Sequence, residues 1–268
     1  MKGGMPAIST LQLGLSVGLV LGVGLVSALL RLGLLRSLLW GTVRTFAQLL
    51  LIGYALTYIF AIDHPLLVVG VILLMVLVGA RAVVSRLKGA PFRVYDLAAF
   101  SLGAGVFLVG TIVCALLIGA DRWWTARISI PIAGMILGAT LNAATLALDR
   151  LIGEVRASAP EIEQLLCLGH SPWEAIRRQV RVALRAGMTP IINALVVVGL
   201  VSLPGMMTGQ ILAGADPLMA VRYQIVVMMM IAASVGLGSL LLVGLAYRRC
   251  FTHEAALLPA LLSSSDDS

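Results

Sequence analysis

The stretch VSLPGMMTGQILAGADP, residues 201–217, interrupts an apolar run and is the first candidate for chemistry. Pro204 cannot donate a backbone hydrogen bond, and the glycines beside it weaken a helix, so we predict a kink or an unwound segment. Carbonyl groups freed within a membrane need partners, and unwound carbonyls can attract a substrate. Two interpretations stay open, a packing kink and a substrate path or gate formed by Pro204, Gly205, Met206, Met207, Thr208, Gly209 and Gln210.

Two polar side chains lie within the second apolar run of the chain. Arg44 and Gln48 are four residues apart and therefore share one face of a helix. An arginine at the centre of a membrane costs about 2.5 to 3.5 kcal/mol on insertion scales. We therefore expect Arg44 either to reach the membrane surface on its alkyl stem or to make an internal polar contact near a permeation path.

A third polar side chain, Asn142, lies in the fifth apolar run. It shares a helical face with Gly134, Gly138 and Thr145. Small and hydroxyl residues at this spacing are typical of helix packing in membranes. The pattern favours packing, with Asn142 as a further candidate pore-lining group.

The soft and titratable residues define no closed metal site. Met228, Met229 and Met230 are consecutive, and successive side chains on a helix point about 100° apart, so they cannot all converge. Met206 and Met207 lie at the predicted kink, where thioethers could contact a passing metal, but such ligands favour Cu(I) over Fe(II). The metal ligands therefore stay unknown at the level of sequence.

A second group of candidates lies in the polar segment 149–188. Ser158 with Glu161, and Ser171 with Glu174, each have the spacing of a helix-capping box. Gly169 between them fits a left-handed helix end. The spacing predicts a first helix of about two turns and a second, basic amphipathic helix that leads to the sixth membrane span.

The first of these two helices needs a partner, because so short a helix is marginal alone in water. It carries Glu161 and Glu163 beside Leu165 and Leu166. Anionic lipid headgroups repel an acidic helix, so a soluble protein is the better partner. We therefore predict a docking segment with the candidates Glu161, Glu163, Leu165, Gly169, Ser171 and Glu174.

The composition places these elements in a membrane. Of the 268 residues, 60% are hydrophobic and 12% are charged, and the mean hydropathy is +1.05. Such values lie outside the range of soluble domains, and a span needs about 20 apolar residues. We predict an all-α integral membrane protein with seven spans: 11–30, 37–60, 65–80, 97–120, 128–148, 189–212 and 217–247.

The positions of the basic residues predict the orientation. With the N-terminus outside and the C-terminus in the cytoplasm, fourteen of the 19 Lys and Arg residues fall in inner segments, as the positive-inside rule requires. The net charge of +7 then reflects topology and anionic lipid, so we predict no nucleic acid partner. We expect a multi-pass protein of the inner (plasma) membrane with one transmembrane domain, 1–252, and a flexible tail, 253–268.

Two segments carry a resemblance to known transporters. EQLLCLG followed by HSPWEAI, residues 163–176, is similar to the coupling loop by which ABC transporter permeases dock on their ATPase, although Gln179 and Arg181 replace the hydrophobic and proline residues expected further on. The stretch VSLPGMMTGQILAGADPLMAVRYQIVVMMM, with RTFAQLLLIGYAL at 44–56, resembles the FetB-type family of ABC permeases, described as iron exporters and related to plant aluminium-tolerance permeases. The resemblance runs from about Leu11 to Arg249 and implies a permease that exports a metal ion such as iron.

The chain carries no phosphate-binding loop of the type GxxxxGK[ST], because its lysines, Lys2 and Lys88, do not follow a glycine. We therefore expect no enzyme activity and no cofactor in this chain. The resemblance implies a separate ATP-binding subunit that holds ATP and Mg²⁺, and a homodimer of the permease in the lipid bilayer. Two alternatives stay open: an ATP-independent secondary transporter or channel, and a membrane scaffold that transports nothing.

Overall fold

The computed structural model describes residues 9–87, 90–113, 115, 125–252 and 254–262. Its contacts divide the chain into two units, 1–63 with 212–215 and 64–211 with 216–268. Within the described residues, seven helices are long and apolar enough to cross a membrane. The prediction of an all-α protein with seven spans is confirmed. Residues 114 and 116–120 of the fourth predicted span, and residues 253 and 263–268 of the predicted tail, lie outside the described residues.

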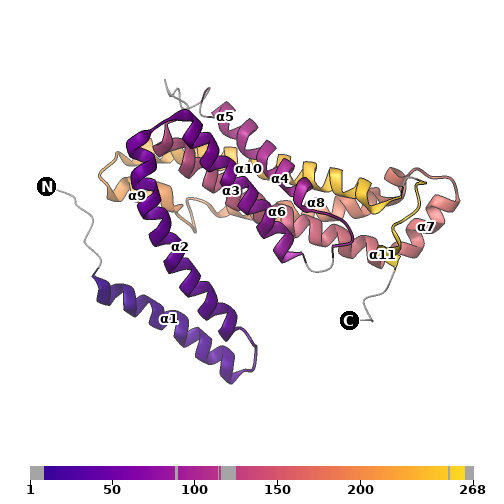
Figure 1. Ribbon diagram of the computed structural model, residues 1–268, viewed down its shortest axis with the longest axis horizontal. Helices are drawn as coiled ribbons and strands as arrows, with labels where there is room; N and C mark the ends of the chain where they lie inside the picture. The colour runs from indigo at the N-terminus through magenta and orange to yellow at the C-terminus, as the bar shows by residue number, and fades with distance from the viewer. Residues whose placement is uncertain (1–8, 88–89, 114, 116–124, 253, 263–268) are drawn as a thin grey trace. The chain divides into compact units, whose positions relative to one another are not determined.

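The first unit contains a pair of long helices, α1 (Thr10–Leu29) and α2 (Leu35–Ile62), that pack on each other (Figure 1). Ser9 and Gln12 cap the start of α1 reciprocally. In the turn between the helices, the backbone N–H of Leu34 donates to the buried Ser27 hydroxyl over 3.2 Å. In α2 no residue is buried, so its apolar surface is suited to lipid or to protein.

The second unit is a bundle of long helices (Figure 1). Its elements are α3 (Pro65–Arg86), α4 (Tyr95–Ala104), the π-helical turn η1 (Gly105–Val109), α5 (Gly110–Ile112), α6 (Ala126–Ala157), α7 (Ala159–Cys167), α8 (Pro172–Val197), α9 (Gly205–Leu212), α10 (Pro217–Ala246), the 3-10 turn η3 (Tyr247–Cys250) and α11 (Pro259–Leu262). Helix α6 packs against α3, α8 and α10 and forms the centre of the bundle. The core of the unit therefore surrounds α6.

Small residues allow α6 and α8 to approach closely. A Cβ atom added to Gly187 of α8 would lie 2.7 Å from the Cβ of Ala147 and 2.8 Å from the carbonyl oxygen of Ala143, both on α6. A Cβ on Gly138 would meet nothing within 4 Å. The predicted packing face of α6 instead meets α3, because a Cβ on Gly134 would lie 3.5 Å from Cε of Met75 on that helix.

The sixth predicted span, 189–212, is wrong in its extent. Helix α8 continues from Pro172 through Pro190 to Val197, and residues 198–204 are not helical before α9 begins at Gly205. Gly199 has a φ of +85°, and its N–H donates to the carbonyl of Ser202 over 2.9 Å. This tight turn ends α8 several residues before Pro204, which hydropathy alone could not reveal.

The segment after α10 folds back on the bundle. Phe251 and Leu257 form an isolated β-bridge, and α11 packs against α6. Leu257 and Leu261 are buried. Residues 254–262 of the tail that was predicted to be flexible therefore have fixed contacts.

Candidate functional site

Helix α7 follows α6 with only Ser158 between them. Ser158 has φ −105° and ψ 14°, and its side chain caps nothing. A capping serine needs an extended backbone, so the capping box predicted for Ser158 and Glu161 is wrong. Glu161 instead forms an ion pair with Arg178 of α8, with a distance of 3.6 Å between Oε1 and Nη1.

The end of α7 has the predicted geometry. Gly169 has a φ of +88°, its N–H donates to Leu166, and the N–H of His170 donates to Leu165. These two bonds satisfy the last carbonyls of the helix. Ser171 and Glu174 then form the predicted capping box at the start of α8, so the turn between the two helices is fixed at both sides.

Helix α7 buries one side and exposes the other. Ile162 is fully buried and Ala159 is 4% exposed, and the helix packs on α6 and α8. Leu165 and Leu166 are half-buried, whereas Glu163 is exposed and Leu168 at the tip is 77% exposed. The helix is therefore anchored by its buried side chains and exposes an acidic and an apolar side chain, Glu163 and Leu168, on its surface.

A cavity of about 510 Å³ lies beside the non-helical segment 198–204. Gly199 and Pro204 line it from that segment, Met207 lines it from α9, and Gln224 and Met228 line it from α10. Met207 is 8% exposed and Gln224 is 7% exposed. The predicted residues Pro204 and Met207 thus meet at one cavity, together with two residues of α10 that the sequence analysis did not select as site residues.

The other residues predicted around Pro204 have different roles. Met206, Thr208, Gly209 and Gln210 are half-buried, whereas Gly205, the first residue of α9, is exposed. The Thr208 hydroxyl donates to the carbonyls of Pro204 and Gly205 over 3.2 and 3.0 Å. The Thr208 hydroxyl therefore stabilises the first turn of α9.

The polar candidates on other helices lie in both units, and Asn142 of the second unit does not line this cavity. Arg44 and Gln48 are exposed on α2 in the first unit. In the second unit, Nη1 of Arg86 donates to Oδ1 of Asn142 over 2.7 Å and joins α3 to α6. Asn142 thus has a partner within the bundle, and its proposed place on a pore stays a prediction.

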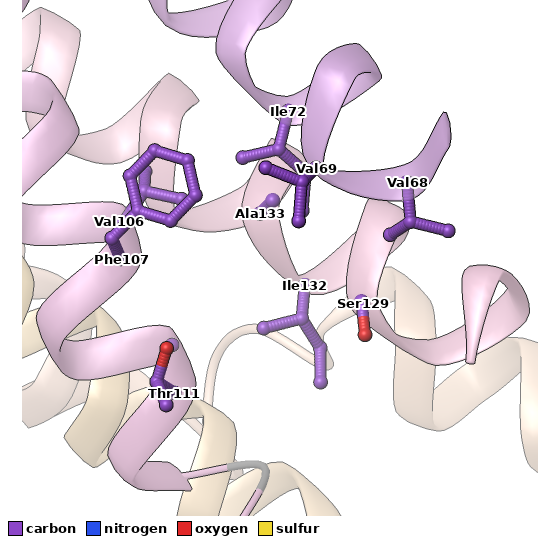
Figure 2. A pocket seen from close by; sticks show the side chains of 10 residues that line it. Val68, Val69, Ile72, Val106, Phe107, Thr111, Ser129, Ile132 and Ala133 are labelled. Atoms are coloured by element: carbon purple, nitrogen blue, oxygen red, sulfur yellow. The ribbon is translucent and has the colours of Figure 1, made fainter. Parts of the chain in front are cut away.

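A second cavity, of about 200 Å³, lies between α3, α6 and the helix that runs from η1 into α5 (Figure 2). Figure 2 shows Val68, Val69 and Ile72 on one side and Phe107 and Thr111 on another. Apart from the hydroxyls of Thr111 and Ser129, its lining side chains are apolar. Its chemistry suits an apolar molecule better than a metal ion.

The comparison with known families covers nearly the whole chain. A model of the uncharacterised protein family UPF0014 matches residues 10–251. The chain belongs to the UPF0014 family. Its resemblance to the FetB-type group, drawn above from the stretch around Pro204, is confirmed by the relatives of this family.

Three relatives of the UPF0014 chain show how far the similarity extends. The UPF0014 membrane protein slr1647 of Synechocystis is 38% identical over 246 residues, which cover 90% of this chain and 95% of that protein. The probable iron export permease protein FetB of Escherichia coli is 33% identical, with 94% of this chain and 95% of FetB covered. The protein ALUMINUM SENSITIVE 3 of Arabidopsis thaliana is 32% identical, with 87% and 84% covered. No solved structure matches the chain.

The family match and the seven apolar helices together make the chain a multi-pass membrane protein. Among the residues that the structure describes, no group of three His, Cys, Asp or Glu side chains could hold a metal ion. Sequence analysis missed residues whose roles depend on tertiary contacts. These are Arg178, which pairs with Glu161, Arg86, which donates a hydrogen bond to Asn142, and Gln224, which lines the cavity. A polar residue within a span was the available signal for Gln224.

Proposed function

We propose that the chain is the membrane-spanning subunit of an ABC transporter that exports a metal ion such as iron. In this proposal a separate ATP-binding subunit holds ATP and Mg²⁺, and two copies of each protein assemble in the plasma membrane with the N-terminus outside. The direction and the iron come from the name of the FetB relative, which is described as a probable iron export permease. The support for docking at α7 comes from the geometry of this chain.

The observation that carries the proposal is the way in which α7 is held. The fully buried Ile162 fixes the helix to the bundle, and the exposed ion pair between Glu161 and Arg178 adds a weaker contact. Leu168, with 77% of its surface exposed at the tip, can bury apolar area against a partner. A helix that is fixed on one side and open on the other can transmit the movement of a docked ATPase to α6 and α8.

The position of α7 adds a second argument. It connects the end of α6 to the start of α8, and α8 leads along the bundle to the cavity at segment 198–204. A displacement at α7 therefore acts on the helix that ends at this cavity. This connection supports ATP-driven access to the cavity as part of the proposal.

The test is to purify the tagged full chain from its native membrane and to measure whether a Walker-motif ATPase co-purifies in fixed stoichiometry. We expect Glu163→Lys and Leu168→Ser to reduce this association, because both side chains are exposed on α7. Glu254→Lys is the matched control, because Glu254 is an exposed carboxylate outside α7. A transported metal ion added to the wild-type complex should raise ATP turnover, and Fe(II) is the first ion to test because of the name of the FetB relative.

The results separate the proposal from its alternatives. No associated ATPase with the wild-type chain would favour a secondary transporter or a scaffold. Association that is unchanged in Glu163→Lys and Leu168→Ser would reject α7 as the docking site. A proton-coupled transporter has little support at the cavity, because none of its lining residues is Asp, Glu or His.

A further inference from the structure

The cavity beside segment 198–204 contains a polar group that the fold does not satisfy. Gln224 lines the cavity and is 7% exposed, and its Oε1 is buried with no hydrogen-bond partner in the structure. A buried amide oxygen without a partner costs roughly 1 to 3 kcal/mol. The cavity is the space from which a partner for this side chain can come.

Thioether groups line the same cavity from two helices. Met207 lies on α9, and Met228 and Met229 lie on α10. Gln224 and Met228 are four residues apart, so they share one face of α10. Met207 is 8% exposed, whereas Met229 is 53% exposed. The less exposed lining residues thus offer three potential donors, namely the sulfur atoms of Met207 and Met228 and the amide oxygen of Gln224.

This donor set selects a class of ion. Thioethers are soft ligands that favour Cu(I), whereas carboxylates, carbonyl oxygens and water suit hard cations. The two sulfur atoms therefore set the class of ion, and the amide oxygen of Gln224 adds a weaker, dipolar contact. The residues that line the cavity include no Asp, Glu, His or Cys, so the site brings no negative charge. A neutral donor set favours a singly charged ion, because desolvating a multiply charged ion costs more.

A simpler role for methionine is gap filling in a core, which its flexible side chain does well. Met230 fits that role, since it is 2% exposed and does not line the cavity. Met207 and Met228 differ because they border open space together with an unsatisfied amide. Gln179, Gln210 and Ser239 also have buried side-chain oxygen atoms without a partner, but among these residues only Gln224 lines the cavity together with methionines.

We infer that this cavity binds one soft, singly charged metal ion of the cuprous class, held by the thioethers of Met207 and Met228 and by the amide oxygen of Gln224. If the proposed function holds, this ion is the cargo of the permease. Only this step of the inference rests on the proposed function. The cargo class then differs from the iron in the name of the FetB relative. Binding itself is a property of this chain alone.

The experiment measures binding to the purified full chain in detergent, without an ATPase. The probes are Ag(I), which is stable in air, and Cu(I) under anaerobic conditions in competition with a chromogenic Cu(I) chelator. We expect one ion per chain and a loss of affinity of about tenfold or more in Met207→Leu, Met228→Leu and Gln224→Leu. Met219→Leu and Met230→Leu are the matched controls and should bind as the wild type does, because neither residue lines the cavity.

A second measurement uses the wild-type protein alone, so that it does not depend on the folding of a variant. Bound Ag(I) should protect Met207 and Met228 from alkylation, as read by mass spectrometry, and should leave the exposed Met219 reactive. The inference is overturned if the wild type binds neither probe, if the cavity variants bind as the controls do, or if Fe(II) binds with the same dependence on Met207 and Met228. Because no ATPase is present, these outcomes are separate from the test of docking at α7.

Discussion

The two ends of α8 differ in how firmly they are held. At the first end, Ser171 and Glu174 close a capping box, and Ile176 and Ala183 are fully buried. At the other end, Val196 is 72% exposed, and the helix stops at Val197 beside a cavity. One helix thus has a fixed end next to α7 and a loosely packed end at the proposed metal site. Segments with few buried contacts open at lower free energy, so movement should concentrate at the second end.

The prolines of the chain do not explain why α8 ends beside the cavity. Pro131 lies inside α6 and Pro190 lies inside α8, and both helices continue through them. Pro204 lies after the break, directly before α9. The residue at the break itself is Gly199, in a left-handed conformation that other residues rarely adopt. The comparison teaches that a left-handed turn, and not a missing N–H group, ends α8.

The largest loss of stability should come from Gly187→Ala in the fixed part of α8. The new Cβ atom would meet Ala147 and the backbone of Ala143 at 2.7 and 2.8 Å. Because backbone cannot yield as a side chain does, the helices must separate, at a cost of about 1 to 3 kcal/mol. Thermal unfolding of the purified protein in detergent should show a clear fall in Tm.

Gly138→Ala is the control for this variant, because the added atom meets nothing within 4 Å on α6. Alanine is the better helix former by about 1 kcal/mol, so Tm should stay the same or rise. A fall of similar size in both variants would contradict a close crossing at Gly187.

The next effect should come from Gly199→Ala at the loosely packed end. The φ of +85° is unfavourable for alanine, at a cost of about 1 to 2 kcal/mol, while an added Cβ meets no atom within 4 Å. The strain should therefore act on residues 198–204 and raise their hydrogen exchange, with little change near Gly187. Gly205→Ala is the matched control, because Gly205 lies in the helical α9 and an added Cβ there also meets no atom within 4 Å. Equal hydrogen exchange of residues 198–204 in the two variants would reject the role of the left-handed turn.

A smaller effect is expected at the fixed end from Ser171→Ala. It removes the hydroxyl that accepts the N–H of Glu174 and donates to its carboxylate over 2.6 Å. Loss of such a cap costs about 1 kcal/mol. Ser158→Ala should have no comparable effect, because Ser158 caps nothing. A Tm scan of both variants checks this, and equal losses would mean that Ser158 does cap α7.

Much of the fold could be predicted from local pattern, and much of the site could not. Hydropathy identified seven spans, and the spacing of Ser171 and Glu174 predicted a real cap. The same spacing at Ser158 misled, because the preceding helix α6 runs into this residue and keeps its backbone from extending. The cavity joins Met207 to Gln224 and Met228 across a long sequence separation, and no local pattern reports such a contact.

The smallest effect should come from Pro204→Ala, the variant that hydropathy and helix propensity would rank first. If proline interrupted a continuous helix, alanine would restore a hydrogen bond to the carbonyl of Leu200 and straighten the span. Here α8 has already ended at Val197, and the carbonyl of Pro204 accepts the N–H of Thr208 over 3.1 Å, which alanine can do equally well. Stability should therefore change by no more than about 0.5 kcal/mol, with unchanged helix content by circular dichroism and unchanged Ag(I) binding. A large gain in helix content would show that the proline itself holds the break open, and the difference between the two ends of α8 would then depend on Pro204 instead of Gly199.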